Sequence, residues 1–307
     1  MTSVSTSFHR INADHKLSTW SKLSYLALNW LGNQFPYTAV DPALTIKDFR
    51  CDISDAQWRS LNQTSSPSRK LSDLFWKTLP WSQIKKELGS IHFVDCGCGN
   101  GSYGPQLFDW CHAENARYLG IDSTLSNQWV NLTDTDRRLQ FLKTDAHALE
   151  KNIPATANLF ISQSAIEHFD DDLMFFSTLK HFIIEKKRPV IQIHLFPSSA
   201  CLPLYLLHGV RQYTPRTISK ITELFGGKEN FSNAVLYRLG GKACNRLHYD
   251  FITWPLLIKK AGDLRQSKPD EYDRRLRKAI LDDMLRPQLS PSFWALVVHS
   301  YPTMQLF

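Results

Sequence analysis

The sequence lacks a long apolar run, a Cys-x-x-Cys pair and any internal repeat. Its 307 residues include only 13 glycines and 15 prolines, which excludes a collagen-like or low-complexity chain. The six cysteines do not imply a disulfide scaffold, because a chain of this length buries a sizeable core without one. Apolar residues make up 43% and charged residues 21%, as in an ordinary globular protein.

No segment has the pattern of a targeting or membrane-spanning sequence. The longest apolar region, residues 190–210, is interrupted by Gln192, His194 and Pro197. The first residues, MTSVSTSFHRINADHK, contain no continuous apolar core. We therefore expect a cytoplasmic protein without a membrane span. The formal net charge of +7 allows an anionic substrate or partner but does not require one.

Short apolar segments alternate with helical patterns from residue 91 onward. The expected strands are residues 91–95, 118–122, 139–143, 158–163, 189–195, 233–239 and 292–300. Strands separated by helices indicate βαβ units and a mainly parallel α/β sheet. Ligands of such sheets bind at the carboxyl ends of the strands, so the residues at these ends are the first candidates for a site.

Helical segments are expected on both sides of this region. Tryptophan and leucine recur at helical spacing between residues 20 and 31, and Ser66 is expected to cap a helix that begins at Pro67. We divide the chain into a helical N-terminal extension (residues 1–88) and an α/β domain (residues 89–307), with a helical insertion (residues 240–290) before the last strand.

A glycine-rich sequence follows the first of the regular strands directly. VDCGCGNGSYG places Asp95, Gly97, Gly99 and Gly101 at alternating positions. Glycine adopts backbone angles that a Cβ forbids, and it lets a ligand approach the main chain closely. The next helix should begin near Ser102, where its free N–H groups favour an anionic group. A tight strand-to-helix turn that binds nothing is the alternative.

One acidic residue ends the second expected strand, and another closely follows the third. Asp122 ends YLGID, and an acid at this position can accept hydrogen bonds from the two hydroxyls of a ribose. Asp145 and Ala146 follow the third strand, where a carboxylate and a backbone N–H suit the edge of an adenine. Each acid alone fits equally well as a cap of the turn or helix that follows it.

Together, these segments resemble the class I S-adenosylmethionine-dependent methyltransferases. DCGCGNG resembles the first motif of that family, GID at 120–122 its ribose-binding acid, and DA at 145–146 its adenine-binding pair. SQSAIEHF at 162–169 resembles the segment after its fourth strand. The resemblance implies a Rossmann-like, seven-stranded, mostly parallel sheet with an antiparallel last strand, and S-adenosylmethionine as the cofactor.

The resemblance also implies which residues bind that cofactor. They lie in the glycine loop and at the ends of the first four strands: Asp95, Cys96, Gly97, Gly99, Asn100, Gly101, Asp122, Ser123, Asp145, Ala146, Ser162 and Gln163. A nicotinamide-dependent dehydrogenase is the nearest alternative. Its G-x-G-x-x-G pattern would need glycine where Ser102 stands.

Histidines near two strand ends are the candidate catalytic bases. Methyl transfer to a hydroxyl requires an aligned acceptor and removal of its proton. His168, with Glu167 beside it, follows the fourth strand, and His194 lies at the end of the fifth. Some RNA methyltransferases of the family hold a metal with E-x-x-E-H at this place, but Ser164 replaces the first glutamate here, and we predict no metal. Histidines that merely pack near the cofactor are the alternative.

The acceptor is expected to be a small molecule or a saccharide. Aromatic, histidine and arginine side chains follow the fifth strand and open the insertion, among them Tyr205, His208, Arg211 and His248. Nucleic acid is a less favoured acceptor, because the charged helix at residues 270–286 balances its acidic and basic side chains. A catalytically inactive partner subunit is the third alternative, and the oligomeric state is not predicted.

Overall fold

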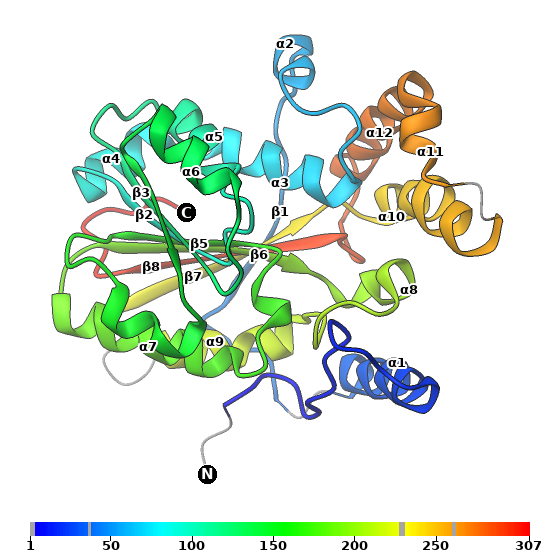
Figure 1. The fold of residues 1–307 in the computed structure, drawn as a ribbon, viewed down its shortest axis with the longest axis horizontal. Coiled ribbons are helices and arrows are strands. Elements are labelled where there is room, and N and C mark those ends of the chain that lie inside the picture. The colour runs from blue at the N-terminus through cyan, green and yellow to red at the C-terminus, as the bar shows by residue number, and fades with distance from the viewer. Residues whose placement is uncertain (1–3, 36–37, 227–230, 260–261) are drawn as a thin grey trace.

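The computed structural model describes residues 4–35, 38–226, 231–259 and 262–307. Its strands are β1 (Thr45–Asp48), β2 (His92–Cys96), β3 (Arg117–Asp122), β4 (Leu139–Lys143), β5 (Leu159–Gln163), β6 (Val190–Pro197), β7 (Ser232–Leu239) and β8 (Phe293–Ser300). These strands form one sheet with helices on both faces (Figure 1).

The helices before β6 are α1 (Thr19–Gln34), α2 (Asp55–Arg59), α3 (Pro67–Thr78), α4 (Trp81–Leu88), α5 (Tyr103–Cys111), α6 (Gln128–Thr135) and α7 (Asp172–Lys186), with the short helices η1 (Ala146–Asn152) and η2 (Ile166–His168). After β6 come η3 (Ser199–Cys201), α8 (Leu202–Tyr205), α9 (Pro215–Gly226), α10 (Lys242–His248), η4 (Tyr249–Thr253), η5 (Pro255–Lys259), α11 (Leu264–Ser267) and α12 (Pro269–Met284).

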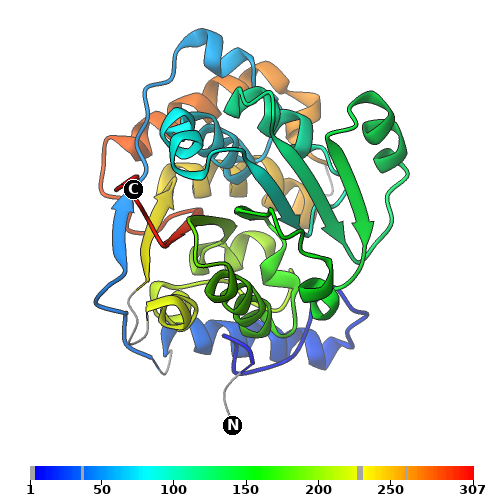
Figure 2. The same cartoon turned by 90° about the vertical axis from the view of Figure 1, so that its left-hand side faces the viewer.

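The strand order is β1-β7-β8-β6-β5-β2-β3-β4. β8 runs antiparallel to β6 and β7, and the other neighbouring pairs are parallel. All of the predicted strands form, so the predicted fold class, with its antiparallel last strand, is confirmed. The predicted strand number is wrong by one, because the N-terminal region adds β1 beside β7 (Figure 2). β1 is a short edge strand, TIKD, without the apolar alternation that predicts a strand.

The chain reverses direction across the sheet between β2 and β5. From β2 it proceeds outward through β3 and β4, and it then returns to place β5 on the other side of β2. The loops after β2 and β5 therefore diverge to opposite faces of the sheet. Such a switch point leaves a crevice at the carboxyl ends of the strands, which is where parallel sheets bind ligands.

Two hydrophobic cores hold the helices against the sheet. One face of the sheet packs against α3, α4 and α5, with Leu71, Trp76 and Leu107 fully buried. The other face packs against α7 and α9, with Phe176 and Ile221 fully buried. In Figure 1 these helices lie above and below the strands. Every residue of β6 and β8 is buried, as expected of strands covered on both faces.

The expected helices outside the sheet also form. Ser66 caps α3, because its Oγ accepts a hydrogen bond from the Arg69 N–H at 3.3 Å. The insertion is helical, and α12 packs against α10 and α3. The division of the chain between residues 88 and 89 stays a prediction. Within the described residues, none of the helices combines the length and the apolar character needed to cross a membrane.

Candidate functional site

A cleft of about 720 Å³ lies at the switch point of the sheet. Its walls come from the ends of β2, β3, β4 and β5, from the start of α7, and from the N-terminal segment that contains Asn12 and Asp14. A cleft of this volume is in the range of about 300–1,000 Å³ that small-molecule sites occupy. The predicted cofactor residues that line it are Cys96, Gly97, Gly99, Asp122, Ser123 and Asp145.

The glycine loop follows β2 and contacts both the end of β3 and the loop after β5. The N–H groups of Gly97 and Cys98 donate to the Ile121 carbonyl at the end of β3, at 2.8 and 3.1 Å. Gly97 has φ +80°, and a Cβ there would lie 2.3 Å from the Cβ of Ala165, in the loop after β5. Gly99 has φ +56°, and a Cβ there would meet nothing within 4 Å. The loop is thus packed at Gly97 and open at Gly99, where a ligand can approach the backbone.

Asp122 is oriented by two backbone donors. Its Oδ2 accepts a hydrogen bond from the Gly99 N–H at 2.8 Å, and its Oδ1 accepts one from the Thr124 N–H at 2.8 Å. A carboxylate has about four acceptor positions, so these bonds leave capacity for a further pair of donors. Asp122 therefore ties the glycine loop to the end of β3 and can also accept hydrogen bonds from a ligand in the cleft.

Asp95 lies at the end of β2 and is almost completely buried. Its Oδ2 accepts a hydrogen bond from the Tyr118 hydroxyl at 2.6 Å, whereas its Oδ1 has no partner among the described residues. Burial raises the pKa of Asp95 to about 7, against the opposing effect of the Tyr118 hydrogen bond. Asp95 does not line the cleft itself, but it carries an unsatisfied acceptor directly before the glycine loop.

The other predicted cofactor residues have structural partners outside the cleft. Asn100 accepts a hydrogen bond from the Ser102 N–H at 3.1 Å, and a Cβ on Gly101 would lie 2.4 Å from the Phe141 ring. Gln163 accepts a hydrogen bond from the Trp76 indole at 3.0 Å. The Ala146 side chain lies outside the described part of the structure. Asp145, which does line the cleft, also accepts a hydrogen bond from the backbone that begins η1.

His194, the second candidate base, does not line the cleft. Its side chain is fully buried between the sheet and α7, with ring contacts to Phe175 and Phe176 at 5.9 and 5.0 Å. Its Nδ1 lies 2.9 Å from the hydroxyl of Ser162. Ser162, one of the predicted cofactor-binding residues, therefore has its partner in the core. Burial lowers the pKa of His194 to about 3. His194 is therefore a neutral core residue that no substrate can reach.

His168 lines the cleft and belongs to a cluster with Glu167 and His208. The His168 Nε2 lies 4.0 Å from the Glu167 Oε1, and the His208 Nε2 lies 3.7 Å from the same oxygen. The two imidazole rings meet edge to face, with centroids 4.6 Å apart. Burial alone would lower the pKa of His208, but the Glu167 carboxylate outweighs this effect and the net shift is upward.

The N-terminal segment holds this cluster in place. The Asp14 Oδ2 lies 2.6 Å from the His168 Nδ1, and the Asp14 Oδ1 accepts a hydrogen bond from the Gly209 N–H at 3.3 Å. The Tyr25 hydroxyl of α1 donates to the His208 carbonyl at 2.6 Å. Asp14 is not among the residues that the sequence predicts, and His208 is predicted only as a feature of the acceptor site. No local signal marks either residue, because the contacts join positions more than 150 residues apart.

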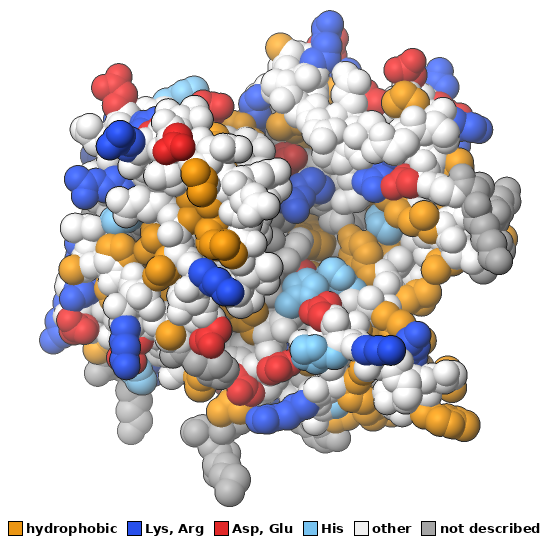
Figure 3. Space-filling view, viewed as in Figure 1, with side chains coloured by type: hydrophobic (Ala, Val, Ile, Leu, Met, Phe, Trp, Pro, Cys, Tyr) orange, Lys and Arg blue, Asp and Glu red, His pale blue; other side chains and the backbone are white. Residues whose placement is uncertain are grey.

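Histidine and acidic side chains gather in the hollow in the middle of the face that Figure 3 shows. Two other expected acceptor residues do not join them. Arg211 is buried and donates to the carbonyls of Phe169 and Asp170 at 2.6 and 2.9 Å, so it supports the loop after β5. His248 is buried against Thr253, at 3.1 Å.

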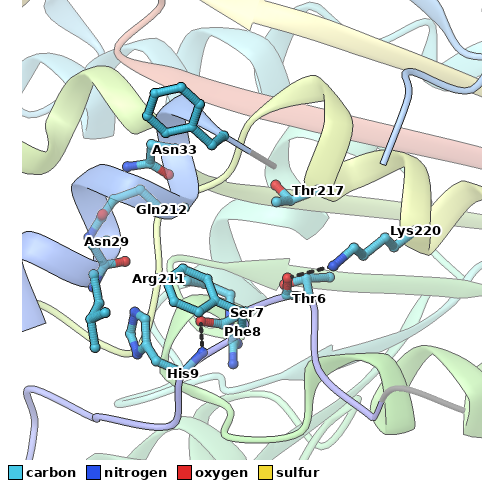
Figure 4. Close-up of a pocket in the computed structure, with 13 residues that line it drawn as sticks. Thr6, Ser7, Phe8, His9, Asn29, Asn33, Arg211, Gln212, Thr217 and Lys220 are labelled. Atoms are coloured by element: carbon cyan, nitrogen blue, oxygen red, sulfur yellow. Dashed lines mark hydrogen bonds between the residues drawn. The ribbon is translucent and has the colours of Figure 1, made fainter. Parts of the chain in front are cut away.

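A second, much smaller cavity separates the N-terminal segment from α1 and α9 (Figure 4). The Lys220 ammonium of α9 donates to the Thr6 carbonyl at 3.1 Å across one side of it, and Asn29 of α1 lines another. Its volume of about 30 Å³ has room for about one water molecule. This cavity therefore belongs to the packing of the N-terminal segment and is too small for a substrate.

No family model and no curated protein matches the sequence. Among solved structures, the chain resembles the plantazolicin methyltransferase BamL in complex with a triazolic desmethylPZN analog and SAH (TM-score 0.44, 13% identity, 80% of this chain and 93% of that one). It also resembles a SAM-dependent methyltransferase from Archaeoglobus fulgidus (TM-score 0.44, 15% identity, 76% and 94%) and StiE O-MT (TM-score 0.42, 14% identity, 76% and 73%). Likeness at this level does not establish a shared activity.

Proposed function

We propose that this protein is an S-adenosylmethionine-dependent methyltransferase that methylates an oxygen of a small molecule or saccharide. The observation that carries the proposal is the joint position of Asp122 and the open backbone of Gly99 at the switch-point cleft. An oriented carboxylate beside an open glycine loop suits a ligand that has a ribose and a charged, compact end.

The cleft offers partners for each part of this cofactor. Asp122 has acceptor capacity for the ribose hydroxyls, and Asp145 lies at the end of the next strand, on the side where the adenine would extend. Asp95 does not line the cleft, but its buried carboxylate, directly before the glycine loop, adds a negative potential that favours the ammonium of the methionine end. When bound, the cofactor supplies a methyl group on a positively charged sulfur. The chain itself binds, orients and shields the reactants.

The acceptor hydroxyl must lose its proton during transfer. His168 is the predicted base that lines the cleft, so we keep it as the residue that acts on the acceptor and withdraw His194. Glu167 is fully buried 4.0 Å from the His168 Nε2, so we keep it as a neighbour of the base and not as a group that touches the acceptor. The Asp14 carboxylate accepts a hydrogen bond from the His168 Nδ1. The Nε2, on the side of Glu167, is then the ring nitrogen that can accept a proton. His208 joins His168 and Glu167 as the third residue of this cluster.

Calorimetric titration with S-adenosylhomocysteine tests the cofactor assignment. The unmodified chain should bind it, and Asp122→Ala should weaken binding at least tenfold, since about 1.5–3 kcal/mol is lost per hydrogen bond to a charged group. Asp134→Ala is the matched control, because Asp134 is an exposed acid on α6 away from the cleft. Absence of binding by the unmodified chain, or equal binding by Asp122→Ala, would refute the proposal.

The acceptor class is tested next, on a chain that binds the cofactor. Hydroxylated small molecules and saccharides are incubated with S-adenosylmethionine, and release of S-adenosylhomocysteine is measured. We expect turnover with a hydroxyl acceptor and its loss in His168→Ala, while binding of S-adenosylhomocysteine persists. Turnover that survives in His168→Ala would remove His168 from the mechanism.

A further inference from the structure

We propose that Glu167, His168 and His208 form a binding site for a divalent first-row transition-metal ion. The starting observation is Glu167, whose carboxylate is fully buried although neither of its oxygens has a hydrogen-bond partner among the described residues. Burying a carboxylate without donors is strongly unfavourable, and an unsatisfied group of this kind in a folded protein calls for an ion or another partner.

Two imidazole nitrogens lie close to this carboxylate, and neither forms a normal hydrogen bond with it. The Nε2 atoms of His168 and His208 lie 4.0 and 3.7 Å from the Glu167 Oε1, beyond hydrogen-bond distance. One ligand atom from each residue lies within 4.8 Å of the others. Atoms bound to a tetrahedral ion at about 2.1 Å are separated by about 3.4 Å, so side-chain rotations that bring the ligand atoms up to about 1.4 Å closer together would place all three on one ion.

Asp14 prepares His168 for this role. Its Oδ2 lies 2.6 Å from the His168 Nδ1, so the Nδ1 carries the proton and the Nε2 presents its lone pair toward Glu167. A carboxylate behind a ligating histidine is a common device at metal sites, because it fixes the tautomer and increases the basicity of the ligand. The same carboxylate, through its bond to Gly209, ties the loop of His208 to His168.

The donor set indicates which kind of ion would bind. Two imidazoles and one carboxylate suit zinc, iron, cobalt or manganese, whereas magnesium prefers oxygen ligands throughout. With both histidines neutral, the cluster carries one negative charge, and Asp14 adds another nearby. The side chains of His168 and His208 are 30% and 34% exposed, so an ion can reach the cluster from solvent and keep open positions.

The sequence predicts no metal, because Ser164 stands where the local motif has a further acidic ligand. His208 comes from another loop and supplies a ligand that the local motif lacks. With the ion bound, the His168 Nε2 is a ligand and no longer a free base. If the proposed function holds, the open positions of the ion face the acceptor, and the ion would lower the pKa of a bound acceptor hydroxyl in place of that base. The metal site itself rests only on the geometry of the cluster.

The test is metal binding by the full chain, freed of metal by a chelator and carrying no histidine tag. Co²⁺ is added while its visible ligand-field absorption is recorded, and Zn²⁺, Mn²⁺ and Mg²⁺ are titrated by calorimetry. We expect one equivalent of Co²⁺ or Zn²⁺ to bind, with Mg²⁺ much weaker. Glu167→Gln and His208→Ala should each weaken binding more than a hundredfold, and Asp14→Ala should weaken it about 10- to 100-fold.

His181→Ala is the matched control, because His181 is an exposed histidine on α7 outside the cluster. Thermal unfolding of every variant shows whether it is folded. The proposal is overturned if none of the transition metals binds, if Mg²⁺ binds more tightly than they do, or if folded Glu167→Gln and His208→Ala bind as well as the unmodified chain. Titration with S-adenosylhomocysteine in the absence of metal reports separately on the cofactor, so the two proposals fail independently.

Discussion

Asp14 and His168 are 154 positions apart in the sequence, yet the Asp14 Oδ2 lies 2.6 Å from the His168 Nδ1. The contact brings the N-terminal segment to the edge of the cleft and fixes which nitrogen of His168 remains available. A second bond, from the Gly209 N–H to the Asp14 Oδ1, connects the same carboxylate to the loop of His208. The residues around His168 at this edge of the cleft thus come from three distant parts of the chain.

The first prediction concerns the tautomer of His168. In the unmodified, metal-free chain at pH 8, nitrogen NMR of labelled histidine should show the proton of His168 on Nδ1, because Asp14 accepts it there. Asp14→Ala should yield a mixture of tautomers or the Nε2-protonated form. An unchanged spectrum in a folded Asp14→Ala protein would mean that the carboxylate does not orient the ring.

The second prediction compares two glycines with similar positive φ angles. Gly97 and Gly89 have φ +80° and +71°, but a Cβ would meet Ala165 at 2.3 Å in the first case and nothing within 4 Å in the second. Both Gly→Ala variants incur backbone strain of about 1–2 kcal/mol, and Gly97→Ala adds overpacking of about 1–3 kcal/mol.

Urea denaturation measures the free energy of unfolding of both variants. Gly97→Ala should be the less stable of the two, and its binding of S-adenosylhomocysteine should weaken, because the loops after β2 and β5 must separate. Equal stabilities would show that the two loops have room to move apart.

The third prediction is the contribution of His194 to pH-dependent stability. Burial lowers the pKa of His194 from 6.5 to about 3, so the unfolded chain takes up a proton on this residue more readily than the folded one. The stability that His194 contributes is present above pH 6.5 and is lost as the pH falls from about 6.5 toward 3.

His194→Gln should remove this contribution, because glutamine does not titrate. Between pH 6 and pH 4, the free energy of unfolding of the unmodified chain should fall by about 1.4 kcal/mol more per pH unit than that of the variant. Urea denaturation at each pH measures this difference. Binding of S-adenosylhomocysteine at pH 7 should be the same in both, since His194 lies away from the cleft. Parallel pH profiles of stability would show that His194 titrates normally in the folded protein.

The fourth prediction concerns the orientation of α1. Tyr25 is fully buried and donates to the His208 carbonyl at 2.6 Å, whereas Trp20 on the same helix is 80% exposed. Tyr25→Phe should destabilise the protein by about 1–2 kcal/mol, because the buried carbonyl loses a hydrogen bond. Trp20→Ser should change the free energy of unfolding by less than about 0.5 kcal/mol, as is usual at exposed positions. The reverse order in thermal or urea denaturation would contradict the packing of α1.

The sheet was predictable because its evidence is local. Each strand of the α/β region is a short apolar segment between helical patterns, and the glycine loop directly follows β2. The packing of α1 was less predictable. Its tryptophans and leucines recur at helical spacing, but the structure leaves Trp20, Leu23 and Trp30 exposed and buries Tyr25 and Asn29. Periodicity identifies a helix, but only its neighbours decide which stripe of residues is covered.

The sequence alone determined the positions of Asp122, Gly97 and Gly99 at the cleft, because the end of a parallel strand and the loop after it are fixed by consecutive residues. Only the tertiary structure decided that His168 lines the cleft and that His194 does not. β6 is buried on both faces, so its residues show no alternation from which the surroundings of His194 could be inferred. The cluster of Glu167, His168 and His208, and its support by Asp14, depends on how separate loops pack, and no spacing along the chain encodes that contact.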